Sequence, residues 1–209
     1  TPTPLGVSDQ FKPRTDIECI PTLNTFGLSY KNFILSVATS EPRKNLLRLL
    51  HAYQALPQSM KTHCPLVLVG GDGWKNKAIK KLIDSLSRKG EVVCTGYVTQ
   101  TQLFHLYASA KLTAFPSLYE GFGLPIIESM ASGTPVLTSN HSAMKEVAAG
   151  HAKLVNPEDV DDIKLQMEAA LGDKEWRENT ARNGMLQAHS FTWKRCALKT
   201  IEAYKATLL

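Results

Sequence analysis

The sequence predicts an α/β domain of the doubly wound, Rossmann-like type, in which helices cover both faces of a parallel sheet. Short apolar runs recur from residue 33 onward. Within each run the apolar residues are consecutive, which is typical of strands that are buried on both faces. Helical patterns of roughly ten to sixteen residues separate these runs, and this alternation is the signature of successive βαβ units.

The predicted elements follow in chain order. The strands are expected at residues 33–38, 66–69, 92–95, 112–115, 135–138 and 153–155. The helices between them are expected at residues 45–55, 75–88, 100–108, 125–132 and 143–148. Three further helices are expected after the last strand, at residues 159–171, 174–189 and 192–207.

The chain divides into three parts. Residues 1–31 contain Pro2, Pro4, Pro13 and Pro21 and show no periodic apolar pattern, so we expect an irregular linker. Residues 32–190 form the predicted Rossmann-like domain, and residues 191–209 form a C-terminal helix.

Composition excludes several classes of protein. The 209 residues carry a net charge of +5, and the basic residues are scattered, which does not favour a nucleic-acid binder. No apolar run approaches the roughly 18 residues that span a bilayer, and the first residues do not resemble a signal peptide. We therefore expect a cytoplasmic protein, and attachment to the inner face of a membrane stays open. The cysteines and histidines show no metal-binding spacing, so no metal and no cofactor is expected.

The segment from Glu120 to Glu128 carries the most chemical information. Gly121 and Gly123 allow the backbone to approach a ligand closely, and Pro125 suits the first turn of a helix. A glycine loop that enters a helix presents free amides and a partial positive charge, and both favour phosphate.

Specific roles follow for this segment. The amides of Phe122, Gly123 and Leu124 are expected to bind phosphates. The Glu128 carboxylate, one turn into the helix, suits a ribose diol, and Glu120 lies on the opposite side of the phosphates. A capping glutamate next to a tight turn is the alternative reading of the same residues.

This segment resembles the signature of the retaining glycosyltransferases of family 4, the group 1 glycosyl transferases, which have the GT-B fold. Their motif is two glutamates with seven residues between them, which Glu120 and Glu128 match, and the flanks at residues 115–117 and 130–136 match as well. The resemblance implies metal-independent transfer of a sugar from a nucleoside-diphosphate donor, with retention at the anomeric carbon.

Arg43 and Lys44 lie at the junction between the first strand and its helix, where cations can neutralise a diphosphate. The resemblance assigns them that role and places them with Glu120 as catalytic residues. Many family members carry Gly-Arg directly after this strand, whereas this chain has Ala38 and Thr39. Lys44 is therefore the safer of the two assignments.

Two more loops concern the donor. The glycine-rich turn that includes Gly71 either leaves room for the donor or simply makes a tight connection. The segment at Tyr97 and Val98 resembles the place where the family holds the nucleotide base, largely through the backbone.

The resemblance extends over nearly the whole chain, but it matches only the C-terminal, donor-binding half of a GT-B enzyme. It implies that the acceptor, a glycan or lipid-linked sugar, binds an N-terminal domain, that the last helix crosses back to that domain, and that the isolated chain is inactive. The transferred sugar is expected to be a hexose, with mannose from GDP-mannose as one candidate.

Other functions remain open from the sequence. They are a stand-alone nucleotide-binding module, an epimerase and a phosphorylase of the same fold. A dinucleotide dehydrogenase is excluded because residues 39–45 contain no glycine. The Asp159-Val160-Asp161 run is interpreted as the acidic start of a helix and not as a metal motif.

Overall fold

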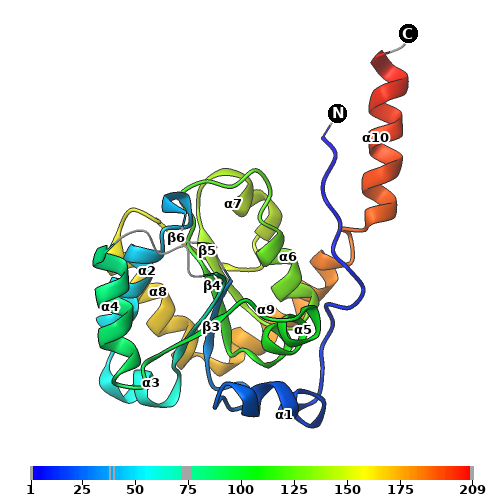
Figure 1. Cartoon of the computed structure of the whole chain (residues 1–209). Helices are drawn as coiled ribbons and strands as arrows, with labels where there is room; N and C mark the ends of the chain where they lie inside the picture. Colours follow the sequence, from blue (N-terminus) through cyan, green and yellow to red (C-terminus); the bar gives the residue numbers. More distant parts are fainter. Residues whose placement is uncertain (1, 38, 40, 72–76, 208–209) are drawn as a thin grey trace.

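The computed structural model describes residues 2–37, 39, 41–71 and 77–207. A six-stranded sheet in the order β3-β2-β1-β4-β5-β6 forms its centre, and every strand pair is parallel (Figure 1). The strands are β1 (Ile34–Val37), β2 (Leu66–Val69), β3 (Val92–Gly96), β4 (Leu112–Phe115), β5 (Val136–Ser139) and β6 (Lys153–Val155). The predicted doubly wound parallel sheet is confirmed.

The strand order reverses between β1 and β4. From β1 the chain moves outward through β2 and β3, and then returns to place β4 on the other side of β1. Ile34 pairs with Leu66 on one side and with Leu112 on the other. In open α/β sheets, ligands bind outside the carboxyl ends of the strands at such a reversal.

Helices cover both faces of the sheet. On one side lie α2 (Leu46–Gln54), α3 (Gln58–His63), α4 (Lys77–Ser87) and α8 (Val160–Gly172). On the other lie α1 (Asp16–Thr25), α5 (Gln100–Ser109), α6 (Leu124–Ala131) and α7 (Ser142–Ala148). Helix α9 (Lys174–Ala188) packs against α6 and α8.

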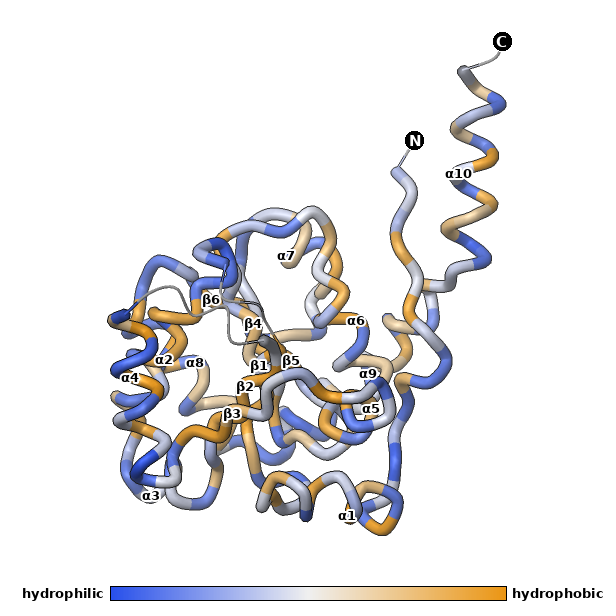
Figure 2. The backbone as a smooth tube through the Cα atoms, viewed as in Figure 1, coloured by the Kyte–Doolittle hydropathy of each residue, from blue (hydrophilic) through white to orange (hydrophobic). Residues whose placement is uncertain are grey.

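Successive side chains of a strand pack into the hydrophobic cores on opposite faces of the sheet. In and beside β1, Ile34 joins the core under α2 and α8, whereas Phe33 and Leu35 join the core under α1 and α5. Because side chains point to opposite faces at successive positions, an uninterrupted apolar run is required for burial on both sides. Figure 2 shows the resulting apolar strands in the middle of the domain.

The expectation of an irregular segment over residues 1–31 is wrong for residues 16–25, which form α1. Thr15 and Glu18 make a reciprocal capping box at its start, and Pro21 lies inside the helix. The Thr22 hydroxyl lies 2.8 Å from Nδ1 of His105, which joins α1 to α5. The interior proline obscured the helix, although the Thr-x-x-Glu spacing is a recognised start signal.

The last helix, α10 (Trp193–Thr207), projects from the domain beside the N-terminal segment (Figure 1). None of its residues is buried, and Leu198, Ile201 and Tyr204 are exposed, as predicted. The two segments cross closely at the base of α10. Val7 donates its amide to the Phe191 carbonyl oxygen at 3.0 Å, and a Cβ on Gly6 would lie 2.2 Å from the Trp193 nitrogen.

The remaining boundaries agree closely with the predictions. Strand β5 is shifted by one residue, and the short helix α3 was not expected. Ala38 and the start of the predicted helix at residue 75 lie outside the described residues. No described helix is both long enough and apolar enough to cross a bilayer.

Candidate functional site

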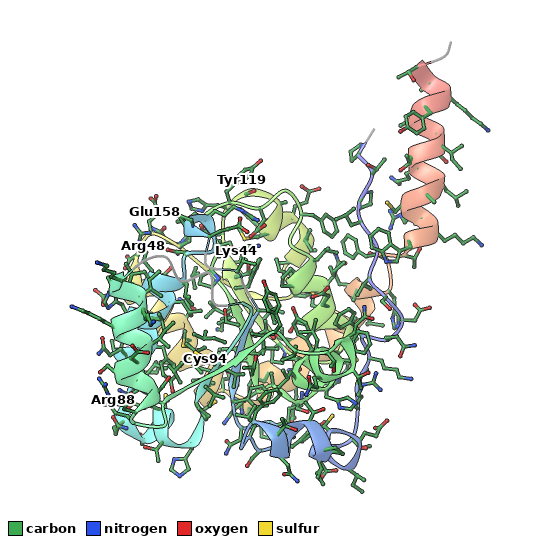
Figure 3. All side chains as sticks on the ribbon, in the orientation of Figure 1. Lys44, Arg48, Arg88, Cys94, Tyr119 and Glu158 are labelled. Atoms are coloured by element: carbon green, nitrogen blue, oxygen red, sulfur yellow. The ribbon has the colours of Figure 1, made fainter. Side chains whose placement is uncertain are left out.

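The candidate site lies at the carboxyl ends of β1 and β4, where the strand order reverses. The loop after β1 contains a short 3₁₀ turn, Pro42–Lys44, and continues into α2 through Asn45. The loop after β4 runs from Pro116 to Gly123 and enters α6. In Figure 3, Lys44 lies at the same end of the domain as Tyr119.

Asn45 joins the loops of the site. It is 4% exposed and adopts the left-handed conformation with a φ of 59°, which asparagine tolerates better than most residues. Its Nδ2 donates to the carbonyl oxygens of Pro116 at 2.9 Å and Pro157 at 2.6 Å. The Leu118 amide also donates to the Arg43 carbonyl oxygen at 2.7 Å. The role of Asn45 could not be predicted from the sequence, because its partners are distant in the chain.

Arg43, Lys44 and Glu120 form one charged cluster. Arg43 Nη1 lies 2.5 Å from Glu120 Oε2, and Lys44 Nζ lies 2.8 Å from Glu120 Oε1. Glu120 is only 8% exposed, and the Lys44 ammonium also lies 5.1 Å from the centre of the Phe115 ring. The structure therefore brings the three predicted catalytic residues into direct contact.

Glu41 extends this cluster toward solvent. Its carboxylate accepts hydrogen bonds from the Thr39 hydroxyl and from Arg43 Nε, both at 2.7 Å. These two bonds, with Thr39 first, lower the pKa of Glu41. Arg43 is therefore held between two carboxylates, which orient its guanidinium.

The loop that enters α6 has the geometry expected of an anion-binding turn. Gly123 caps the helix with a φ of 98°, a conformation that favours glycine. Among the described residues, none accepts a hydrogen bond from the amides of Phe122, Gly123 or Leu124. The Ser142 hydroxyl donates to the Glu120 carbonyl oxygen at 2.8 Å and fixes the start of the loop.

Glu128 lies deeper, on the second turn of α6. Burial raises the pKa of its carboxyl group, and the nearby Tyr107 hydroxyl opposes that shift. The Tyr107 hydroxyl is buried and makes no hydrogen bond of normal length and angle with a described residue, so Glu128 is its nearby polar neighbour and not a fixed partner. No ion pair or side-chain hydrogen bond joins Glu128 to Glu120, Arg43 or Lys44.

A cavity of about 430 Å³ lies beside the cluster and contains the predicted base-binding residues. Its walls include Val37, Thr39, Glu41, Arg43, Lys44, Val69, Gly70, Tyr97, Val98 and Leu103. The Tyr97 side chain is 87% exposed and lies over Gly71, where a Cβ would come within 2.4 Å of the ring. Gly71 therefore makes room for Tyr97, while residues 72–74 of the predicted turn lie outside the described residues.

Two residues of the predicted phosphate-binding segment line a different cavity. Gly121 and Phe122 line a cavity of about 500 Å³, together with Pro4, Phe191 and other residues near the base of α10. The loop that enters α6 therefore also borders the N-terminal segment and the base of α10.

Asp159 acts as a helix cap. Its carboxylate accepts hydrogen bonds from the amides of Asp161 at 2.9 Å and Asp162 at 3.1 Å. This confirms the interpretation of the acidic run as a helix start. Among the described residues, no group of three or more histidine, cysteine or acidic side chains is arranged to hold a metal ion.

Comparison with known proteins identifies a family. A sequence profile described as "Glycosyl transferases group 1" matches residues 27–187. The chain is 40% identical over 203 residues to O-antigen chain mannosyltransferase B of Escherichia coli, and this alignment covers 97% of the chain and 53% of that protein. It is 31% identical over 211 residues to the MMP alpha-(1->4)-mannosyltransferase of Mycolicibacterium hassiacum, with 98% of the chain and 48% of that protein covered.

Solved structures share the fold. A glycosyltransferase from Rickettsia africae aligns with a TM-score of 0.84 at 19% identity, covering 98% of this chain and 56% of that one. The Anabaena protein HepE, solved with UDP and glucose, aligns with a TM-score of 0.83 at 18% identity, covering 96% and 55%. The chain thus spans about half the length of the proteins that it matches.

Proposed function

The chain belongs to the group 1 glycosyl transferases, and from this membership we propose that it binds the nucleoside-diphosphate sugar for an enzyme that transfers a hexose. The observation that carries the proposal is the convergence of Arg43 and Lys44 on Glu120 beside the cavity that contains Tyr97. Two cations at the carboxyl edge of a parallel sheet are suited to a diphosphate.

In the proposed complex, the diphosphate contacts Arg43 and Lys44 from one side and the free amides of Phe122, Gly123 and Leu124 from the other. Breaking the bond between the sugar and the diphosphate leaves negative charge on the leaving group. Cations and amides that are already oriented stabilise this charge without reorganising. Because Glu120 holds both cations, donor binding has to redistribute these contacts, and it leaves the Glu120 carboxylate facing the sugar.

The rest of the donor follows from this placement. The base lies in the cavity beside Tyr97 and Val98, and the ribose hydroxyls reach the Glu128 carboxylate. The half-buried Glu128 carboxyl has a raised pKa, and hydroxyl donors compensate it for the water that it has lost.

We propose GDP-mannose as the donor. Its support is that relatives from two organisms are named mannosyltransferases. Retention at the anomeric carbon is part of the same proposal. So is independence from metal ions, since Arg43 and Lys44 supply the positive charge that a metal would otherwise provide. In the same proposal, the acceptor, a glycan or lipid-linked sugar, binds a domain outside these 209 residues. We also propose that this domain associates peripherally with the membrane.

Calorimetric titration of UDP, GDP and ADP tests the binding site. We expect GDP to bind most tightly, and Glu128→Ala to weaken the preferred nucleotide about tenfold or more, as is typical for the loss of a hydrogen bond to a charged group. Glu158→Ala serves as a matched control on an exposed acid. If Glu128→Ala leaves the affinity for every nucleotide unchanged, the assigned site is wrong.

A further inference from the structure

A second group of cations gathers at the opposite edge of the sheet, where the strands begin. Lys31 precedes β1, Lys111 precedes β4, and Lys174 and Arg177 come from the start of α9. They line a pocket of about 390 Å³, here called the amino-edge pocket, whose other walls are Gly133, Pro135, Glu178 and Ala181. Four cations thus face one carboxylate.

Lys31 is fixed in place within this pocket. Its Nζ donates to the Ala110 carbonyl oxygen and to the Thr134 hydroxyl oxygen, both at 3.1 Å. Its backbone has a φ of 54°, a left-handed conformation in which glycine or asparagine is normally found. The two hydrogen bonds of the ammonium group hold the Lys31 side chain at this edge of the sheet.

The positive charge of the amino-edge pocket is poorly balanced. Lys111 makes no ion pair or side-chain hydrogen bond with any residue in the described part of the chain. Lys174 pairs with Glu178 at 3.6 Å on an exposed surface, and Arg177 Nη1 donates to the carbonyl oxygens of Ala170 and Leu171. Burial lowers the pKa of Lys31 to about 8, which is the response of an ammonium without a nearby counter-ion.

We propose that the amino-edge pocket binds the phosphate group of a small organic phosphate or of a phospholipid head group. Lysine and arginine are the usual partners of phosphate, and the pocket volume lies in the range of small-molecule sites. Pro135 and Ala181 offer an apolar wall for the organic part. The strands separate this pocket from the donor cluster by about 13 Å, and the two sites share no lining residue.

Calorimetry with inorganic pyrophosphate tests the pocket. The double variant Arg43→Gln/Lys44→Gln first removes pyrophosphate binding at the donor cluster. In this background, we expect a remaining binding event that Lys111→Glu weakens at least tenfold, while Lys80→Glu, an exposed lysine on α4, leaves it unchanged. Lys174→Glu, whose side chain is 80% exposed, should weaken it as well and cannot disturb a buried contact. Circular dichroism confirms that each variant is folded.

Vesicles distinguish the two sources of phosphate. If the ligand is a lipid head group, the chain should co-sediment with phosphatidylcholine vesicles that contain phosphatidylglycerol. Lys111→Glu should abolish this co-sedimentation, and Lys80→Glu should not. Pyrophosphate binding that depends on Lys111, without vesicle binding, assigns the pocket to a soluble phosphate. The proposal is overturned if neither pyrophosphate nor vesicle binding responds to Lys111→Glu.

Discussion

Asn45 fastens the loop after β1 to the loop after β4 by donating from Nδ2 to the Pro116 carbonyl oxygen at 2.9 Å. The same nitrogen reaches the loop after β6 through Pro157. This buried amide therefore helps to set the relative position of Arg43, Lys44 and Glu120, together with the Leu118–Arg43 backbone hydrogen bond.

Replacing Asn45 with alanine should lower the free energy of unfolding by about 2–4 kcal/mol, because two buried carbonyl oxygens lose their donor and the left-handed backbone becomes strained. Urea denaturation measures this change. Asn45→Gly keeps the backbone conformation but not the donor, so it separates the two causes. If both variants unfold at the wild-type urea concentration, Asn45 does not join the loops.

Lys44→Gln should weaken GDP binding about tenfold or more while leaving guanosine binding nearly unchanged, because in the proposed complex the ammonium contacts the diphosphate and not the nucleoside. Calorimetry with both ligands measures the difference. Lys80→Gln is the matched control, since Lys80 is an exposed lysine outside the site. An equal loss of affinity for guanosine would instead indicate a general distortion of the cavity.

Glu128→Gln should stabilise the fold at neutral pH and weaken nucleotide binding. Burial raises the folded-state pKa of Glu128, so the folded chain holds a proton more tightly than the unfolded chain. The ionised carboxylate therefore costs stability above its folded pKa, and this cost disappears as the pH falls through that value. Thermal melts of wild type and Glu128→Gln, recorded at intervals of about one pH unit from about pH 4 to about pH 8, measure this effect. The two melting temperatures should differ at the upper end of this range and converge at the lower end.

Gly71→Ala should displace the Tyr97 ring, because the new Cβ would lie 2.4 Å from it. If the base packs beside Tyr97, nucleotide affinity falls several-fold, on the order of 1 kcal/mol. Tyr97→Ala removes the clash, so adding Gly71→Ala to Tyr97→Ala should have no further effect. A double-mutant cycle measures this coupling, and strictly additive losses would contradict the contact.

The exposed apolar side chains of α10 should make the chain self-associate as the concentration rises. Sedimentation velocity measures the effect, and Ile201→Asp should restore a monomer. Leu186→Asp, an exposed apolar position on α9, is the matched control. A monomeric wild-type profile at high concentration would refute the prediction.

Much of the fold could be predicted because its signals are local. Buried strands such as residues 66–69 are apolar at every position, and Gly123 followed by Pro125 marks the entry to α6. Helix α1 was missed because Pro21 interrupts its pattern, although its capping box was readable.

The site was harder to predict than the fold. The resemblance to a family supplied Arg43, Lys44 and Glu120, but their mutual contact spans more than seventy residues of chain. No local pattern encodes such a contact. Asn45 could not be recognised for the same reason, since its partners are backbone oxygens that the fold brings to it.

The crossing at Gly6 connects the base of α10 to the loop before α6. Its base is held by the Val7–Phe191 hydrogen bond, and the Phe191 ring meets Phe122 edge to face with 5.6 Å between ring centres. Phe122 belongs to the loop that we propose to bind the phosphates. The position of α10 is therefore tied to this loop by one backbone hydrogen bond and one edge-to-face ring contact, so a partner that held the far end of α10 would also constrain the loop before α6.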